Sequence, residues 1–434
     1  MQVRTKLADD SIELRVPAGH VVANLDGGLL HATGIPYASA VRWQRPVALP
    51  ARRIVAKTKA RACPQLPVPR LDAALPDAFQ GLQFDENCLD LSITAPVGAD
   101  KLPVIVWLHG GSYESGAADM AIFNPDALVA EQNVVFVSVS YRLGLFGWLS
   151  GDGRPANLGG LDVIAALRWL AKNIAGFGGD PGNVTLLGQS SGGDLAARLL
   201  LAPDAQGLFH RAIIQSAPLA LPLAAQRLQN AMRKAAGDLT HDMSVATLLE
   251  HQQRVRKAVR LRGLAGQMPF GPEFGAEPFP AVHELRDTQV AAAQRIPIMI
   301  GHVQDEAALF VPPSHSFVGR LADAARRLLV ASLTSRLYGA PGREFAWRHI
   351  AAGGQAQRFV IEWEGGAFGK AHLLDLPLLF PGPEWVGTPL LPANMSLDEL
   401  TEAGRPLRAL WAGFARDGQA GKDVPGIVRF APQG

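Results

Sequence analysis

A serine in a glycine-flanked turn is the strongest chemical signal in the sequence. Residues 188–192 read Gly-Gln-Ser-Ser-Gly, directly after an apolar run and before a helical pattern that starts at Asp194. A sharp turn from strand to helix strains its central residue and lifts that side chain above the sheet, while flanking glycines avoid Cβ clashes. The hydroxyl then lies at a helix N-terminus, where unpaired N–H groups favour developing negative charge. This register selects Ser190 as a nucleophile, with Gly188 and Gly192 as the supporting turn, although a capping serine in an ordinary glycine-rich turn is the competing interpretation.

A second glycine-rich turn could supply the hydrogen-bond donors that such a nucleophile needs. The apolar run 104–108 ends in the stretch His-Gly-Gly-Ser. Adjacent glycines after a strand leave backbone N–H groups free to point at a substrate oxygen, and losing one such donor costs roughly 100- to 1000-fold in rate. We therefore expect the N–H groups of Gly111, Ser112 and Ser191 to form an oxyanion hole. Gly110 would supply the tight turn.

The elements that must position these two turns alternate along the chain. Short apolar runs are typical of strands covered on both faces, and the amphipathic stretches between them indicate helices. The expected strands are residues 104–108, 134–139, 184–187, 212–214, 298–300 and 359–361, and the expected helices include residues 161–174 and 195–201. This alternation predicts an α/β fold with a mostly parallel central sheet flanked by helices.

Two segments interrupt the alternation. Residues 219–290 are polar with a helical pattern, and residues 311–357 are rich in Ala and Arg and also indicate helices. We interpret both as helical insertions into a single domain of residues 1–434. Its catalytic core would then comprise about residues 1–218 and 291–434.

Basic residues gather in the first of these segments. They are Arg254, Arg256, Lys257, Arg260 and Arg262. We interpret them as the solvated face of a helix, because the flanking chain lacks the large apolar face of a helix that lies on a membrane. Contact with a membrane or an acidic partner is the competing interpretation.

Composition and charge exclude several functional classes. The 434 residues are 48% hydrophobic and 18% charged, as in globular proteins, and the net charge of +2 gives no reason to expect a nucleic-acid or membrane-surface partner. No apolar run reaches the ~18 residues of a membrane span. Acidic residues stand near the N-terminus, where a signal peptide would have its apolar region. We therefore expect a cytoplasmic protein that acts on a small molecule.

Six further stretches carry recognisable motifs. They are residues 34–38 (GIPYA), 85–91 (DENCLDL), 141–144 (YRLG), 177–181 (FGGDP), 208–212 (LFHRA) and 411–415 (WAGFA). With the two turns above, and in the same order, they resemble the type-B carboxylesterase family, the α/β-hydrolase group that includes carboxylesterases and cholinesterases. The resemblance implies the α/β-hydrolase fold and a serine esterase, and the short chain is similar to bacterial-type members.

The resemblance also indicates the other two members of a catalytic triad, which follows the chain order Ser, acid, His in this fold. Asp305 and Glu306 come after the expected strand 298–300, and either carboxylate could serve. The family's Asp-Glu-Gly pattern favours Glu306, with Asp305 as the alternative. His372 lies in a segment that resembles the family's histidine motif, and His349 is the next candidate.

The two helical insertions are where the family places the walls of its active-site cleft. This chain is shorter than most members after Ser216 and between Phe310 and His372. The resemblance therefore implies a more open cleft.

Cys63 and Cys88 stand where the family commonly joins two cysteines. The resemblance implies a possible disulfide, although a reducing cytoplasm would leave both as thiols. Neither cysteine has the spacing of a metal site, and the expected chemistry requires no metal or organic cofactor.

The expected function is that of a serine carboxylesterase, which hydrolyses neutral, rather apolar carboxylic esters through an acyl-enzyme intermediate. Cholinesterases face their quaternary ammonium with an aromatic side chain, but residues 63–88 contain no tryptophan, and neutral Gln189 stands where a glutamate is commonest. A non-catalytic adhesion or binding homologue is less favoured, because such relatives lack the nucleophile that Ser190 supplies. A related amide, lactone or thioester hydrolase stays open.

Overall fold

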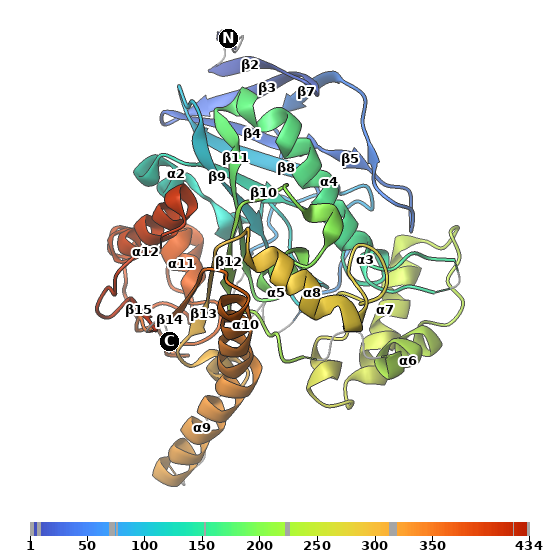
Figure 1. Ribbon diagram of the computed structural model, residues 1–434, viewed down its shortest axis with the longest axis vertical. Helices are drawn as coiled ribbons and strands as arrows, with labels where there is room; N and C mark the ends of the chain where they lie inside the picture. The colour runs from blue at the N-terminus through green and yellow to red at the C-terminus, as the bar shows by residue number, and fades with distance from the viewer. Residues whose placement is uncertain are drawn as a thin grey trace.

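A twisted sheet runs through the molecule and ends in hairpins at its N-terminal edge (Figure 1). The computed structural model describes residues 4–6, 10–68, 74, 77–151, 153–221, 226–311, 319–419 and 421–431. Within these residues the strands of the sheet, in spatial order, are β1 (Arg4–Lys6), β2 (Ser11–Val16), β3 (Gly19–Asp26), β4 (Leu29–Pro36), β8 (Asp90–Pro96), β10 (Val135–Val139), β9 (Leu102–Leu108), β11 (Gly179–Gln189), β12 (Arg211–Gln215), β13 (Ile298–Val303), β14 (Ala356–Ile361) and β15 (Val428–Phe430). A further strand, β7 (Arg52–Ala56), pairs with β3, and β5 (Ala38–Ser39) and β6 (Val47–Ala48) form a separate pair.

The centre of the sheet is parallel. The strands toward its two ends pair antiparallel, except that β7 pairs with β3 in parallel. Strands β10, β9, β11, β12, β13 and β14 pair in parallel, and each of the six predicted strands lies in one of them. The pairs from β1 to β4, and those of β8 with β4 and β10, are antiparallel. Only the parallel part was predicted. In β2 polar and apolar residue types alternate, so this strand forms no continuous apolar run, and in β3 polar residues flank a short apolar run of three residues.

Helices cover both faces of this sheet. Along β9, Val104 and Val106 pack into one core, and Ile105 and Trp107 pack into the other, as the alternation of side chains in a strand requires. The helices on the first side are α4 (Leu158–Asn173), α5 (Ser191–Leu199) and α10 (Ala340–Ala351). Those on the second side are α2 (Asp126–Gln132), α11 (Asp375–Leu379) and α12 (Leu397–Asp417). Short α3 (Gly144–Gly147) contacts α4.

The two segments expected as insertions differ from each other. In the first, α6 (Gln226–Ala236) packs against α7 (Val245–Val259), and α8 (Leu285–Ala293) follows before β13. In the second, α9 (Gly319–Thr334) extends away from the body (Figure 1), but α10 packs on β13 and β14. The neighbouring parallel strands β13 and β14 need a crossover connection between them. Helix α10 belongs to this connection, so it covers the sheet and is not an addition to the fold.

Among the described residues, no helix combines the length and the apolar character that crossing a membrane would require.

A buried ion pair ties the chain after β10 to helix α4. The Arg142 guanidinium donates to both carboxylate oxygens of Asp162, at 2.8 and 2.6 Å, and also to the carbonyl of Gln44 at 2.6 Å. Both members of the pair are almost fully buried. Removing one partner of such a pair leaves an uncompensated charge in the interior.

We expect Asp162→Asn to lower the free energy of unfolding by about 3 to 5 kcal/mol, because Arg142 would stay buried without its counter-charge. Urea unfolding measures this change. The control is Glu344→Gln, which removes one partner of the exposed Arg348–Glu344 pair and is expected to change stability by at most about 0.5 kcal/mol. Equal effects of the two substitutions would contradict this account of the buried pair.

Candidate active site

The turn between β11 and α5 carries the expected nucleophile in a strained conformation. Ser190 has φ 56° and ψ −124°, a region that residues other than glycine rarely occupy. A Cβ on Gly188 would lie 2.2 Å from the carbonyl oxygen of Gly192, and one on Gly192 would lie 2.0 Å from that of Leu108. Both positions therefore require glycine, and the turn can pass close to the neighbouring strand only with these residues.

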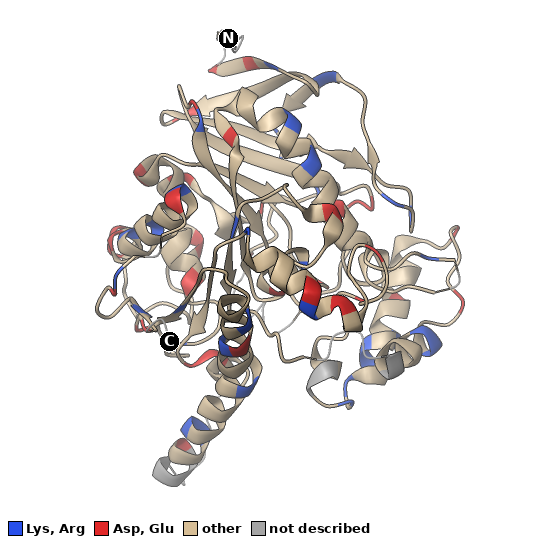
Figure 2. Ribbon diagram, in the orientation of Figure 1, with Lys and Arg blue, Asp and Glu red and all other residues tan. Residues whose placement is uncertain are grey.

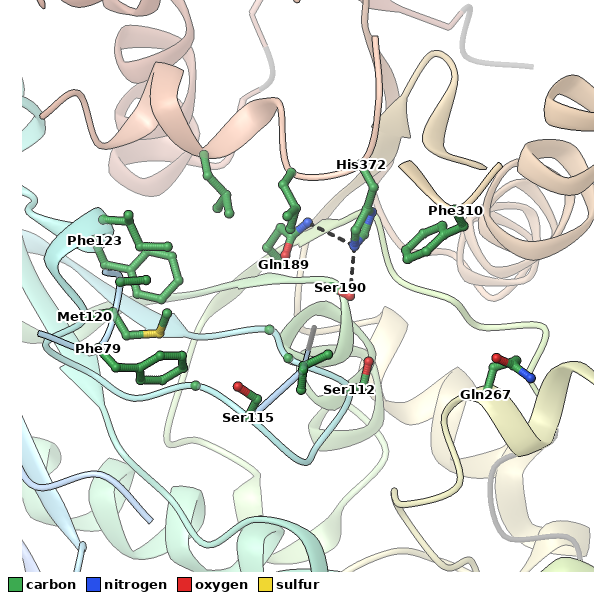
Figure 3. Close-up of a pocket in the computed structure, with 18 of the residues that line it drawn as sticks. Phe79, Ser112, Ser115, Met120, Phe123, Gln189, Ser190, Gln267, Phe310 and His372 are labelled. Carbon is green, nitrogen blue, oxygen red and sulfur yellow. Dashed lines mark hydrogen bonds between the residues drawn. The ribbon is translucent and has the colours of Figure 1, made fainter. Parts of the chain in front are cut away.

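Three predicted side chains meet above this turn. The Ser190 hydroxyl lies 3.1 Å from His372 Nε2, and His372 Nδ1 lies 2.5 Å from Glu306 Oε2 (Figure 3 shows the serine–histidine contact). The other carboxylate oxygen of Glu306 accepts from the backbone N–H of Val303 at 2.8 Å. When Nδ1 donates to the carboxylate, Nε2 is free to accept the serine proton. The arrangement can therefore activate a hydroxyl for attack.

The electrostatic surroundings keep the carboxylate of Glu306 charged. Burial raises its pKa, but attraction to His372 and the hydrogen bond from that imidazole outweigh burial, so the pKa of Glu306 lies below its ordinary value. The alternative acid, Asp305, is only partly buried, and its backbone N–H donates to the Lys370 carbonyl. His349 lies on α10 and donates to the carbonyl of Ile296 at 2.9 Å. Of these alternatives, His372 is the imidazole that contacts Ser190, and Glu306 is the carboxylate that contacts His372.

The turn after β9 lies directly against the nucleophile. A Cβ on Gly110 would be 3.1 Å from the Cβ of Ser190. Gly111 and Ser112 have φ of 111° and 59°, and within the described residues their backbone N–H groups have no acceptor. Free, fixed N–H groups beside a nucleophile are what an oxyanion hole needs. The third expected donor, the N–H of Ser191, belongs to the first residue of α5.

Several contacts that sequence reasoning did not identify hold this turn in place. The side chain of Ser191 accepts from the backbone N–H of Tyr113 at 3.3 Å, and the Tyr113 hydroxyl donates to Asp194 at 2.7 Å. Tyr141 donates to the carbonyl of His109 at 2.8 Å, and the two rings stack with centroids 4.5 Å apart. Burial lowers the pKa of His109 to about 4, so its imidazole is neutral and acts as part of the packing. Tyr141 is the first residue of the motif 141–144 noted in the sequence, and this motif was the sequence signal that could have indicated its role.

A cavity of about 440 Å³ opens above Ser190. Its apolar lining consists of Val68, Ala78, Phe79, Met120, Ile122, Phe123, Phe310, Leu373 and Leu376. Its polar lining includes Arg256, Arg260 and Gln267 from the first inserted segment, besides the catalytic candidates. Figure 3 shows Phe79, Met120 and Phe123 on one side of Ser190 and Gln267 on the opposite side. None of the described residues of the second expected insertion, 311 and 319–357, lines it, so among the described residues only the first insertion contributes to this cavity.

The two cysteines are buried thiols. Cys63 and Cys88 are both buried and free in the structure, so the possible disulfide is not formed here. The Cys63 sulfur accepts from the backbone N–H of Leu143 at 3.3 Å. A hydrogen bond with Cys63, together with burial, raises the pKa of the Cys88 thiol.

In the part of the chain that the structure describes, no three His, Cys, Asp or Glu side chains are grouped so that they could hold a metal ion.

Comparisons with known proteins relate the chain to esterases and other hydrolases. A family model described as the carboxylesterase family matches residues 31–351. A "probable N-octanoylanthranilate hydrolase" of Rhodococcus erythropolis is 37% identical, over 82% of this chain and 81% of that protein. The para-nitrobenzyl esterase of Bacillus subtilis is 31% identical, over 77% of this chain and 74% of that protein. A solved structure of a thermophilic para-nitrobenzyl esterase has a TM-score of 0.80 at 26% identity and covers 96% of this chain and 93% of its own.

A second buried carboxylate lies behind the three meeting side chains. Asp375, on α11, accepts from the amide of Gln215, whose oxygen accepts from the indole N–H of Trp411 at 2.7 Å. Burial and the neighbouring charge of Glu306 raise the pKa of Asp375 to about 7. The folded protein therefore holds a proton at this position at pH values where the unfolded chain, with a pKa of ~3.9, does not.

We expect Asp375→Asn to change how stability depends on pH. In the wild type the contribution of Asp375 falls as the pH rises from about 4 to about 7, because the folded state binds the extra proton over that range. Asparagine cannot ionise, so the melting temperature of the variant should rise relative to that of the wild type between pH 5 and pH 8. Thermal unfolding at both pH values measures the gap, with Asp323→Asn, an exposed position on α9, as the control. A gap that does not widen at pH 8 would disprove the expectation.

Proposed function

The chain belongs to the carboxylesterase family and is a serine ester hydrolase, and from this premise we propose that Ser190, His372 and Glu306 are its catalytic triad. One observation carries the proposal: an unbroken chain of hydrogen bonds runs from the Ser190 hydroxyl through both nitrogens of His372 to Glu306. The strained backbone of Ser190 supports it further, since such strain is typical of this kind of nucleophile.

The mechanism follows from these three roles. His372 takes the proton of Ser190 as the hydroxyl attacks the ester carbonyl, and Glu306 stabilises the resulting imidazolium and fixes its tautomer. The N–H groups of Gly111, Ser112 and Ser191 stabilise the charge on the tetrahedral oxygen. The imidazolium then protonates the leaving alcohol, and an acyl-enzyme remains. Water, deprotonated by the same imidazole, attacks this intermediate and releases the acid.

The cavity supports an ester with an apolar acyl group. Buried Met120, Ile122 and Phe123 line one side of Ser190, and burying hydrocarbon against such side chains is favourable by roughly 25 cal/mol per Å². No carboxylate is among the residues that line the cavity within the described chain. A cationic choline ester is therefore a poor fit. We infer a rather apolar acyl ester as the substrate.

Hydrolysis of an N-acyl amide is a second candidate. It is favoured by the relative from Rhodococcus erythropolis, whose name specifies an N-octanoyl substrate. The triad chemistry is shared between the two, so a matched butanoyl ester and butanoyl anilide decide the order of preference. We expect the ester to react faster, because its alcohol leaves more readily than an amine.

We expect Ser190→Ala and His372→Ala to lower kcat/KM for p-nitrophenyl butyrate by about 10⁴-fold or more, and Glu306→Gln by roughly 10³- to 10⁴-fold. Asp305→Asn is the matched control for the acid and should stay close to the wild type. A loss of activity in Asp305→Asn that equals the loss in Glu306→Gln would refute the assignment of the acid.

We further propose that the protein works in a reducing compartment such as the cytoplasm, with both cysteines as thiols. Free, buried Cys63 and Cys88 support this. Alkylation of the denatured protein without reductant, followed by mass spectrometry, should therefore label two thiols per chain. Unlabelled protein that reacts only after reduction would show that a disulfide forms.

A further inference from the structure

Two arginines at the end of α7 line the same cavity as the candidate triad. Arg256 lies in the last turn of α7, and Arg260 follows that helix directly. Because they are four residues apart, they face the same side of the helix. Lys and Arg colour parts of α6 and α7 in Figure 2, but of the five basic residues noted in the sequence only these two line the cavity. Arg260 is exposed, as expected for a solvated face, whereas Arg256 is only partly exposed, and both line the cavity as well.

The positive charge of this pair is not balanced. Arg256 Nε lies 3.4 Å from a carboxylate oxygen of Glu114, and its Nη1 donates to the carbonyl of Pro67 at 3.4 Å. Burial raises the pKa of Glu114 to about 7, although Arg256 beside it acts in the opposite direction, so this carboxylate is only partly charged at neutral pH. Arg260 is exposed, and within the described residues its guanidinium has neither a hydrogen-bond nor an ion-pair partner.

The chain that carries Arg260 lies across Ser190 from one part of the apolar lining, Phe79, Met120 and Phe123. The amide of Gln267 donates to the Arg260 carbonyl at 3.0 Å, so the chain that carries Arg260 lies beside Gln267. Figure 3 places Gln267 across Ser190 from Met120 and Phe123. A substrate bonded at Ser190 thus has one arm toward buried hydrocarbon and the other toward exposed positive charge.

The sequence of the two chemical steps indicates which part of the substrate lies on each side of Ser190. The acyl group stays bonded to Ser190 after the first step, whereas the alcohol must leave before water can attack. The leaving group therefore belongs on the side that reaches solvent, where Arg260 is exposed. The acyl group belongs on the side of Met120, Ile122 and Phe123, which are buried.

We propose that Arg256 and Arg260 bind a carboxylate on the leaving group, so that the preferred substrates are apolar acyl esters of a carboxylate-bearing alcohol or phenol. This rests on the proposed function and narrows it: the acyl part is apolar, but the substrate as a whole is an anion. Guanidinium groups donate paired, charge-assisted hydrogen bonds that match the shape of a carboxylate. The exposed position leaves Arg260 free to adjust to such a group.

The test uses two esters that differ only in charge, the butanoyl esters of 3-hydroxybenzoate and of 3-hydroxybenzamide. The measured quantity is the ratio of their kcat/KM values, with the uncharged ester reporting any general loss of activity. We expect Arg260→Gln to lower this ratio about tenfold, and Arg260→Glu to lower it further by repulsion. Arg254→Gln, an exposed change on the same helix away from the cavity, is the matched control and should keep the wild-type ratio.

The outcomes separate this inference from the proposed function. A ratio that falls in both Arg260 variants and stays constant in the control supports the carboxylate site. Equal ratios in the wild type and all three variants overturn it, while leaving the esterase intact. If the wild type hydrolyses neither ester, the proposed function itself fails. An Arg256→Gln variant adds to the test only where its melting temperature equals that of the wild type, since it leaves Glu114 buried without its partner.

Discussion

The strained backbone of Ser190 is the constraint on which the whole site depends. Residues other than glycine rarely adopt the backbone angles of Ser190, φ 56° and ψ −124°. This conformation therefore persists only because the surrounding structure enforces it. The surroundings of Gly188 and Gly192 leave no room for a Cβ at either position. The backbone N–H of Ser190 also donates to the carbonyl of Gln215 on β12. The result is a hydroxyl held away from the sheet, within hydrogen-bond distance of an imidazole 182 residues further along the chain.

The parallel centre of the sheet explains why such distant residues meet. Gly111 follows β9, Ser190 follows β11, Glu306 follows β13 and His372 comes after β14. Parallel strands bring their carboxyl ends to one edge of a sheet, so the four turns gather at that edge. They meet there although they are far apart in the sequence. The antiparallel strands at the N-terminal side extend the core but carry none of these groups.

The features that could be predicted from the sequence are those that local patterns determine. The features that depend on tertiary contacts could not be predicted. Continuous apolar runs indicated the central strands, and glycine spacing indicated the turn at Ser190, because both follow from backbone sterics. Glu306 was separated from Asp305 only by a family pattern, since nothing local distinguishes adjacent carboxylates; contact with His372 does so. The sequence analysis interpreted Arg256 and Arg260 only as part of a solvated basic face, because nothing local shows that both line the cavity.

The most direct test of this account is covalent labelling with diethyl p-nitrophenyl phosphate, which phosphorylates an activated serine and releases p-nitrophenol. The account predicts one diethylphosphoryl group per chain, mapped by peptide mass spectrometry to Ser190, and labelling at least about 100-fold slower in His372→Ala. Phosphorylation at another serine, or equally fast labelling of Ser190 without the imidazole, would contradict the claim that His372 activates this hydroxyl.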